Sequence, residues 1–412
     1  MFQKEMTKVM IETDNLKKLY EKKALARCVF LWGIGKKTGS LLEEVHKFIP
    51  DLIIQGIIDN YKAAFISNYK GITVYPAEKI KEYKKSDICV LLAVATSKSI
   101  WKQLRAVGVD KVYNLSSLED TLVEMKCDFP YTFIDRSKGE RNCVYVLAGY
   151  QRELWDTTLH RMIFFMETGI DYCFITSGKY DEEIDKKCKR HGWSYLYSEY
   201  NQICYLQNIV VEKHPKAEIF IKLDEDIFIS RGFYSGMIKG YLEASQIGEY
   251  HVGCVVPIMP LNYNSYISYL KEIGKLKEFE DRYGRAYRCT FSAPYSLEDA
   301  AIWIWNTVGS IDKMAERFSK RSISPNPLCS LYNIGAFLYS RRRWEMFGRW
   351  PEDPDDTGMG VDEGYLFHEN MESGMATYEI QNVFVGHFAF SGQKQKMFEY
   401  YRTNHKIFEI TE

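Results

Sequence analysis

The chain has 412 residues, of which 46% are hydrophobic and 26% charged, and its formal net charge at pH 7 is −1. This composition is typical of a soluble globular protein, and at roughly 100–200 residues per domain the length predicts two or three domains. The balanced charge argues against a nucleic-acid-binding protein, because such proteins usually carry a basic excess.

The N-terminal part of the chain alternates apolar runs with helical patterns. Strands are predicted at residues 28–32, 52–58, 88–95 and 111–115, and helices at residues 4–26, 40–48, 77–84 and 97–107. This alternation predicts a parallel sheet covered by helices. We assign residues 1–130 to a Rossmann-like domain.

A glycine-rich turn follows the first predicted strand. Gly33, Gly35 and Gly39 precede a helix, and Asp59 lies 20 residues after Gly39. The pattern is close to the dinucleotide-binding fingerprint, in which glycines let a phosphate approach a helix N-terminus. Its third glycine falls one place late. We therefore expect either a bound nucleotide, of unassigned identity, or a scaffold role for this domain.

The second half of the chain starts a new series of strands and helices after a segment rich in Pro, Gly and charge near residues 125–142. Strands are predicted at residues 143–148, 171–176, 193–197, 219–223 and 251–258, and helices at residues 154–166, 181–191, 203–214 and 232–246. Residues 141–412 form the second predicted domain. Residues 260–330 break the pattern and are interpreted as an insertion on the acceptor side of a site.

The most informative motif is Asp224-Glu225-Asp226 at the end of an apolar strand. Ligands of open α/β sheets bind at the carboxyl ends of strands, and side chains two residues apart share one face of a strand. Two carboxylates on one face need a cation, and their oxygens suit Mg²⁺ or Mn²⁺. Glu225 points to the other face, so we expect a lesser role for it.

In this setting the triplet resembles the metal-binding motif of GT-A-fold glycosyltransferases, specifically the family 2-like inverting enzymes. The likeness covers most of residues 143–390. It rests on the strand 144–148 with its following turn, on Leu206-Gln207-Asn208-Ile209, on residues 332–337, on Gly358-Met359-Gly360-Val361-Asp362-Glu363 and on Val385-Gly386-His387-Phe388. The N-terminal half, including residues 56–60, is similar to Rossmann-like domains of bacterial sugar-modifying enzymes.

The resemblance implies roles for individual residues. Metal ligands are Asp226, Asp224 and His387, with Asp226 binding directly and Asp224 binding through water or holding the ribose. The nucleotide sugar is contacted by Ala148, Tyr150, Arg152, Asp224, Asn333 and Gly335. The catalytic base is Glu363, with Asp362 supporting the acceptor or taking the base role itself. The chain departs from the family where the second strand ends, at Ile175-Thr176-Ser177-Gly178, without the expected aspartate.

The implied enzyme uses Mn²⁺ or Mg²⁺ and a nucleotide-sugar donor, with a UDP-sugar favoured. Its acceptor is a saccharide or a lipid-linked saccharide of a bacterial cell-surface polysaccharide. The chain shows no signal peptide and no run of about 18 apolar residues, so we expect a cytoplasmic protein. A lipid-linked acceptor would bring it to the inner face of the membrane. The oligomeric state is not indicated.

Two other functions are compatible with the sequence. A sugar nucleotidyltransferase would need a glycine-rich and basic phosphate loop after residues 143–148, and Gly149-Tyr150-Gln151-Arg152 is a poor example of one. A non-catalytic protein that binds a nucleotide sugar or NAD would need neither Asp362 nor Glu363.

Overall fold

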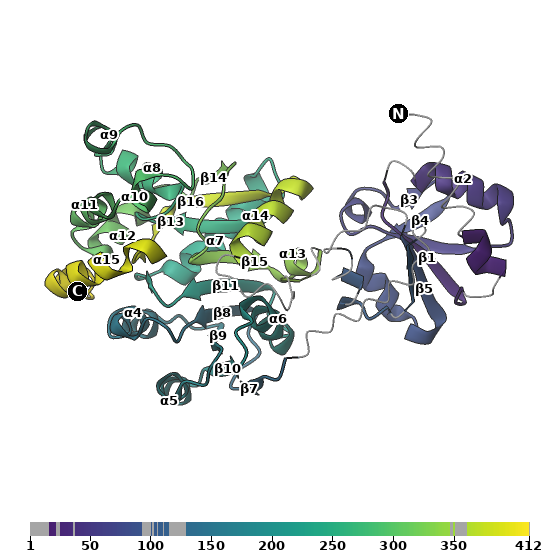
Figure 1. Cartoon of the computed structure of the whole chain (residues 1–412), viewed down its shortest axis with the longest axis horizontal. Coiled ribbons are helices and arrows are strands. Elements are labelled where there is room, and N and C mark those ends of the chain that lie inside the picture. Colours follow the sequence, from purple (N-terminus) through teal and green to yellow (C-terminus); the bar gives the residue numbers. More distant parts are fainter. Residues whose placement is uncertain are drawn as a thin grey trace. The chain divides into compact units, whose positions relative to one another are not determined.

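A computed structural model (Figure 1) describes residues 16–21, 25–35, 38–92, 100, 103–104, 106–109, 111–114, 129–346, 349–350 and 361–411. The chain divides into two compact units, residues 1–126 with 344–349 and residues 127–343 with 350–412. Each unit contains a sheet with parallel strands and helices around it, so the predicted α/β class is confirmed.

The first unit has a six-stranded sheet in the order β3-β4-β2-β1-β5-β6. Its strands are β1 (Cys28–Trp32), β2 (Ile54–Ile58), β3 (Asn68–Tyr69), β4 (Ile72–Tyr75), β5 (Ile88–Leu92) and β6 (Val112–Asn114). Its helices are α2 (Thr38–Phe48) and the 3₁₀ helices η1 (Lys62–Ala64), η2 (Ala77–Glu82) and η3 (Lys85–Asp87). All pairings are parallel except that of β3 with β4.

The central strands of this unit are buried on both faces, as a near-continuous apolar run requires. Two hydrophobic clusters cover the two faces of the sheet, one including Leu31 and Leu91 and the other Phe30 and Val90. The segment expected to be an α-helix at residues 77–84 is instead 3₁₀. Most of the helices predicted at residues 4–26 and 97–107 lies outside the described residues.

The second unit has a nine-stranded sheet in the order β14-β16-β13-β15-β11-β8-β9-β10-β7. Its strands are β7 (Thr132–Ile134), β8 (Asn142–Leu147), β9 (Ile170–Ser177), β10 (Ser194–Ser198), β11 (Ile219–Asp224), β13 (Val252–Ile258), β14 (Pro325–Leu328), β15 (Ala336–Ser340) and β16 (Ala376–Phe384). A separate antiparallel pair joins β12 (Ile227–Phe228) to β17 (Gly386–His387).

Helices of the first part of this sheet are η4 (Arg152–Leu154), α4 (Thr158–Phe164), α5 (Glu182–His191), α6 (Ile203–Lys213) and α7 (Phe233–Ile247). Strands β11, β8, β9 and β10 run parallel, and helices alternate with them along the chain. In Figure 1, α4 and α5 lie on one side of these strands and α6 on the other. Such a crossover arrangement leaves the carboxyl ends of β8 and β11 open for a ligand.

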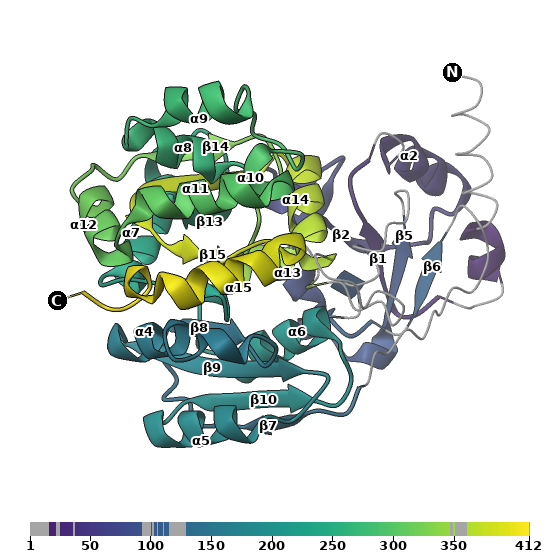
Figure 2. The ribbon, with the colours of Figure 1, turned by 60° about the vertical axis from the view of Figure 1, so that its left-hand side comes forward.

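The later helices are α8 (Ser265–Glu272), α9 (Leu276–Tyr283), α10 (Ala293–Ser296), α11 (Glu298–Val308), α12 (Ile311–Ser319), α13 (Arg341–Met346), α14 (Val361–Ser373), η5 (Ser391–Gln393), α15 (Lys394–Thr403) and η6 (His405–Ile407). Helices α8 to α12 gather with α15 at one end of the unit (Figure 2). They share a core that includes Tyr266, Trp303 and Trp305, so these three aromatic residues of the predicted insertion have packing roles.

Residues 132–134, which the sequence placed in a loosely structured segment, form the edge strand β7 beside β10. Three residues give too short a pattern to register as a strand. None of the helices in the described parts of the chain is both long and apolar enough to cross a membrane.

Candidate active site

The candidate site lies where three strand ends meet in the second unit. Strands β8 and β11 are parallel, and their register places Asp224 opposite Leu147. Strand β15 runs antiparallel to β11, so the residues before it lie beside the same end. The backbone N–H of Asp224 donates to the carbonyl of Gly335 at 2.7 Å. The topology thus brings together the acidic triplet, the loop after β8 and the loop before β15.

Glu225 fixes the loop that follows β8. Its carboxylate is buried and accepts hydrogen bonds from the backbone N–H groups of Gly149, Tyr150 and Gln151 at 2.9, 2.8 and 3.0 Å. It also accepts one from the indole N–H of Trp155 at 2.6 Å. Burial raises the pKa of Glu225, while these donors lower it. Glu225 thus has a structural role, because it shapes the loop.

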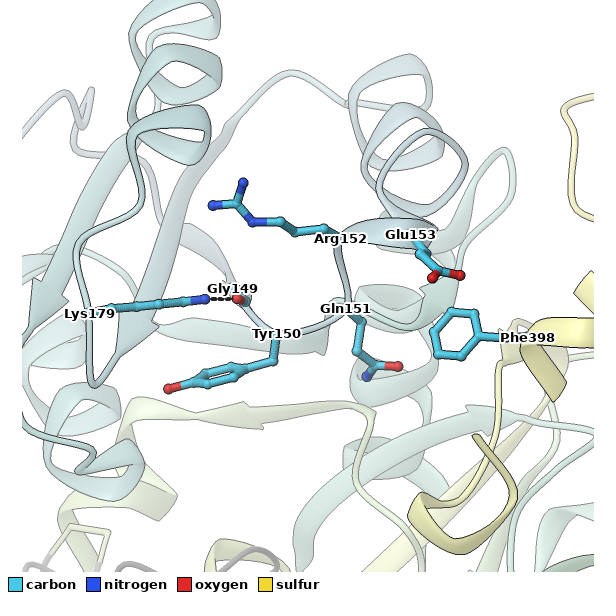
Figure 3. Close-up of a pocket in the computed structure, with 7 residues that line it drawn as sticks. All are labelled: Gly149, Tyr150, Gln151, Arg152, Glu153, Lys179 and Phe398. Carbon is cyan, nitrogen blue, oxygen red and sulfur yellow. Dashed lines mark hydrogen bonds between the residues drawn. The ribbon is translucent and has the colours of Figure 1, made fainter. Parts of the chain in front are cut away.

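The loop forms one wall of an open pocket of about 420 Å³ lined by Gly149, Tyr150, Gln151, Arg152, Glu153, Lys179 and Phe398 (Figure 3). The Lys179 ammonium donates to the carbonyl of Gly149 and lies 4.5 Å from the ring centre of Tyr150. The Tyr150 hydroxyl donates to the carbonyl of Ser177. This hydrogen bond keeps the exposed ring of Tyr150 along the pocket. Ala148 is buried just before the loop, and its N–H donates to Ile175.

Strand β9 ends at Ser177, and an acidic residue, Asp181, follows four positions later. The Asp181 side chain caps helix α5 through the N–H groups of Glu183 and Ile184. It also accepts a 2.6 Å hydrogen bond from the guanidinium of Arg152. Arg152, predicted to contact the nucleotide, is therefore held by Asp181 at the edge of the pocket. The sequence pattern missed this acid because it follows the strand at a distance.

Asp226 and His387 face each other across the small sheet, in which Ile227 pairs with His387. Asp226 Oδ2 and His387 Nε2 are 4.0 Å apart, and both side chains are buried. His387 Nδ1 lies 2.7 Å from the carbonyl oxygen of Leu261. Since a carbonyl only accepts, Nδ1 carries a proton, and Nε2 is the ring nitrogen that faces Asp226.

These atoms fit a divalent cation. Besides the Asp226 and His387 atoms, Gln151 contributes an amide whose nitrogen donates to Asp226 Oδ2 at 2.9 Å and whose oxygen is buried without a hydrogen-bond partner. Carboxylate, imidazole and amide donors suit Mn²⁺ or Mg²⁺. Within the described residues, however, no group of three or more His, Cys, Asp and Glu side chains is arranged to hold a metal.

Asp224 is paired with a buried lysine of its own strand. The Lys222 ammonium lies 2.7 Å from Asp224 Oδ1, 4.0 Å from Asp362 Oδ2 and 3.1 Å from the carbonyl oxygen of Ile334, to which it donates. The Lys222 side chain is 3% exposed, whereas that of Asp224 is 34% exposed. A lysine within an apolar strand is a sequence signal for such a pairing, because buried charges need partners.

The predicted catalytic residues begin helix α14. Asp362 is buried, and its Oδ2 accepts a hydrogen bond from the Gln207 amide at 3.2 Å. Gln207 in turn accepts one from the Tyr145 hydroxyl at 2.8 Å, and this hydroxyl is 3.0 Å from that of Tyr339. Asp362 therefore ends a buried polar network that fixes its orientation. The glycines expected upstream, Gly358 and Gly360, lie outside the described residues.

Two carboxyl groups at the site have raised pKa values. Burial, followed by the charge of Asp362, raises the pKa of Glu363 to about 8, although the Ile334 N–H and Lys222 act in the opposite direction. Burial also raises the pKa of Asp224, and the neighbouring Asp226 and Asp362 add to this effect, against the attraction of Lys222. Clustered carboxylates with perturbed pKa values are a common mark of functional sites.

The loop before β15 contains the remaining predicted donor residues. The Asn333 side chain accepts a hydrogen bond from the N–H of Gly335 at 3.3 Å, and its carbonyl accepts one from Asn262 at 3.0 Å. A Cβ atom on Gly335 would come within 2.9 Å of the Ile227 side chain, so glycine permits the close approach of these segments. Both residues shape the site through the backbone.

In the first unit, Asp59 of the glycine-rich pattern makes hydrogen bonds within the protein. Asp59 accepts hydrogen bonds from the N–H groups of Ile34 at 3.0 Å and Lys62 at 2.8 Å. Its carboxylate thus holds the glycine-rich turn in place. Each carboxylate oxygen accepts one of these bonds and has a second acceptor site, so the two bonds do not exclude a ribose contact.

Comparison with known proteins gives a family match for part of the chain. The family described as C2185-like, N-terminal, matches residues 25–113, within the first unit. No curated protein matches the chain.

Three solved structures are similar to the chain. They are GalNAc-T7 with UDP, GalNAc and Mn²⁺ (16% identity, TM-score 0.39, 61% of this chain and 45% of that chain), the mannosyltransferase PcManGT from Pyrobaculum calidifontis with GDP-Man and Mn²⁺ (12%, 0.38, 65% and 62%) and the inositol-1-phosphate CTP transferase from T. maritima (12%, 0.31, 65% and 96%). The chain spans less than two thirds of the length of both glycosyltransferases. Likenesses this distant assign no activity.

Proposed function

We propose that the second unit is a metal-dependent glycosyltransferase that moves a sugar from a nucleotide sugar to an acceptor hydroxyl with inversion. The observation that carries the proposal is the convergence of Asp226 Oδ2 and His387 Nε2, 4.0 Å apart, at the carboxyl end of β11. The pocket wall formed by the loop after β8 includes Gln151, which contacts Asp226. This combination suits a cation that binds a nucleoside diphosphate beside a protein loop.

Each residue group has a distinct task in this reaction. Asp226 and His387, with Gln151, hold the cation, which when bound stabilises the charge that develops on the leaving diphosphate. Tyr150 offers an exposed ring against which the nucleotide base packs. Glu363 accepts the proton of the attacking hydroxyl, and general-base help of this kind is typically worth 10²–10⁴-fold in rate.

The wider setting is part of the same proposal. The donor is a nucleoside diphosphate sugar, with a UDP-sugar favoured, and the cation is Mn²⁺ or Mg²⁺. The acceptor is a saccharide or a lipid-linked saccharide used in bacterial cell-surface polysaccharide synthesis. A lipid-linked acceptor requires the enzyme to work at the inner face of the membrane.

One observation speaks against the alternative of a sugar nucleotidyltransferase. A phosphate-binding loop after the first strand needs free backbone N–H groups that point at the phosphates. Here the N–H groups of Gly149, Tyr150 and Gln151 all donate to Glu225. The loop therefore cannot cradle a triphosphate without breaking three hydrogen bonds to a buried carboxylate.

The proposal is tested by thermal denaturation of the full chain with the UDP, GDP, CDP and dTDP sugar series, each with Mn²⁺ and with EDTA. A ligand at a hundredfold excess over its Kd stabilises the fold by about 2.7 kcal/mol. We expect a metal-dependent shift with one nucleotide class, and its loss in Asp226→Ala. A shift only with NAD, or a shift that survives Asp226→Ala, would contradict the proposal.

A further inference from the structure

The connection between α9 and α11 has an unusual composition. From Arg282 to Leu297 it contains three arginines, no aspartate, glutamate or lysine, and four aromatic residues. The aromatic residues are Tyr283, Tyr287, Phe291 and Tyr295. We refer to residues 282–297 as the arginine-aromatic segment.

Four large apolar side chains of this segment are exposed. Phe291 is 86% exposed, Tyr287 54%, Leu297 47% and Tyr295 42%. No other large hydrophobic side chain in the described parts of the chain is as exposed as Phe291. Single exposed apolar residues are ordinary, but several in a short stretch indicate an interaction surface.

The exposure does not come from a loosely attached backbone. The carbonyl of Tyr287 accepts a hydrogen bond from the Tyr266 hydroxyl at 2.8 Å. The Gln393 amide donates to the carbonyls of Pro294 and Tyr295 at 2.7 and 3.0 Å. The fold thus anchors the segment from the inside and projects its rings outward.

Two of the three arginines remain available to an outside partner. Arg288 turns inward and donates to Asn264 and Ser268. Arg282 and Arg285 are exposed and form no ion pair within the described residues; their guanidinium groups lie over aromatic rings of the protein. Of the acids that flank the segment, Asp281 pairs with Lys277, and Glu298 and Asp299 share Lys396. Within the segment itself, the charges without an ion-pair partner are those of Arg282 and Arg285, and they are positive.

We propose that the arginine-aromatic segment docks the second unit onto an anionic lipid bilayer. Phe291 and Leu297 enter the apolar boundary, the tyrosine rings lie at headgroup depth, and Arg282 and Arg285 meet the phosphates. Aromatic and arginine side chains are the residues that favour this interface. A single phenylalanine that projects this far needs no matching pocket in a fluid bilayer, whereas a folded protein partner would have to supply one.

The segment also lies next to the candidate site. Tyr295 contacts Phe390, with ring centres 4.9 Å apart, and Phe390 contacts His387 at 5.3 Å. Docking would therefore place the site close to the membrane surface, where a lipid-linked acceptor is held. The proposed binding to the bilayer does not depend on the activity of the site. Its role in bringing the site to a lipid-linked acceptor rests on the proposed transferase function.

The test is co-sedimentation of the full chain with vesicles of phosphatidylcholine alone or mixed with phosphatidylglycerol. We expect binding to the mixed vesicles only, weakened by high salt. Phe291→Ser should lower the partition coefficient about tenfold, because it removes a phenylalanine that docking would bury in the bilayer. Arg285→Gln should lower it about fivefold, as expected for one cation near an anionic surface. Ile247→Ser, at a 62% exposed position on α7, is the matched control and should bind as the wild type does.

Failure of the wild type to bind the mixed vesicles would overturn the proposal, as would equal binding by wild type, Phe291→Ser and Arg285→Gln. If light scattering instead showed that Phe291→Ser dissociates an oligomer that ignores vesicles, the surface would be a contact between copies. The nucleotide-dependent thermal shift is measured in the same variants. It should be unchanged in Phe291→Ser, so a failure of docking is distinguished from a failure of the proposed chemistry.

Discussion

The Glu225 carboxylate accepts a 2.6 Å hydrogen bond from the indole N–H of Trp155, which joins the end of β11 to the helical turn after the pocket loop. Three backbone N–H groups of that loop share the same carboxylate. The four donors offset part of the cost of burying this carboxylate. The central residue of the acidic triplet is thus a structural anchor of the donor pocket.

We expect Glu225→Gln to destabilise the second unit by about 1–3 kcal/mol, because an amide NH₂ would face backbone donors and leave one of them buried without a partner. Nucleotide binding should weaken as the loop loses its shape. Thermal denaturation and nucleotide titration measure the two effects. Trp155→Phe, which removes one donor only, should cost less. A Glu225→Gln variant with wild-type melting temperature and affinity would contradict the anchoring role.

His387 offers a second prediction, because its two nitrogens have separate partners. His387→Gln should weaken Mn²⁺ binding in the presence of nucleotide by more than about tenfold, since even residues that only support a ligand are worth 10–100-fold. Calorimetric titration measures this affinity. His214→Gln is a matched control, because His214 is also buried and its Nδ1 also contacts a backbone carbonyl, that of Val210 at 2.8 Å. Equal Mn²⁺ affinities in the two variants would remove His387 from the metal site.

The α/β class and most of the strands could be predicted because buried parallel strands appear as apolar runs. The acidic triplet was also visible, because it follows such a run directly. The residues that the side chains of this triplet contact could not be predicted. Asp224 pairs with Lys222 rather than joining Asp226, and Glu225 binds a loop 74–76 residues away. Such pairings depend on which strands become neighbours in the sheet, which one sequence does not specify. Edge strand β7 was too short to recognise.

The third prediction concerns the buried ammonium group of Lys222. Lys222→Met removes the ammonium that lies 2.7 Å from Asp224 and 4.0 Å from Asp362. Breaking a buried pair typically costs 3–5 kcal/mol, and we expect about 3 kcal/mol because Asp224 is one-third exposed. Without the cation the pKa of Asp224 rises further, so the variant should regain stability as pH falls. Melting temperatures across pH test this; a deficit that is constant with pH would contradict it.

The last prediction concerns the proton on Glu363. Its folded-state pKa of about 8 exceeds the ordinary value of 4.5, so between these values the folded protein keeps a proton that the unfolded chain has released. The stability that this proton contributes is complete below pH 4.5 and is lost as pH rises through 8. Glu363→Gln mimics the neutral form, so its advantage over wild type should grow with pH to the order of 2 kcal/mol, discounted for partial exposure.

Thermal denaturation in EDTA at a series of pH values measures this difference, and an advantage that does not change with pH would show that Glu363 is ionised in the folded state. Activity separates the two candidate bases. A base must be unprotonated to accept the acceptor proton, so transfer should rise as pH approaches 8 if Glu363 acts. Glu363→Gln should then keep the nucleotide-dependent thermal shift and lose transfer. If Asp362→Asn shows that pattern instead, the base is Asp362, the residue that Gln207 already orients.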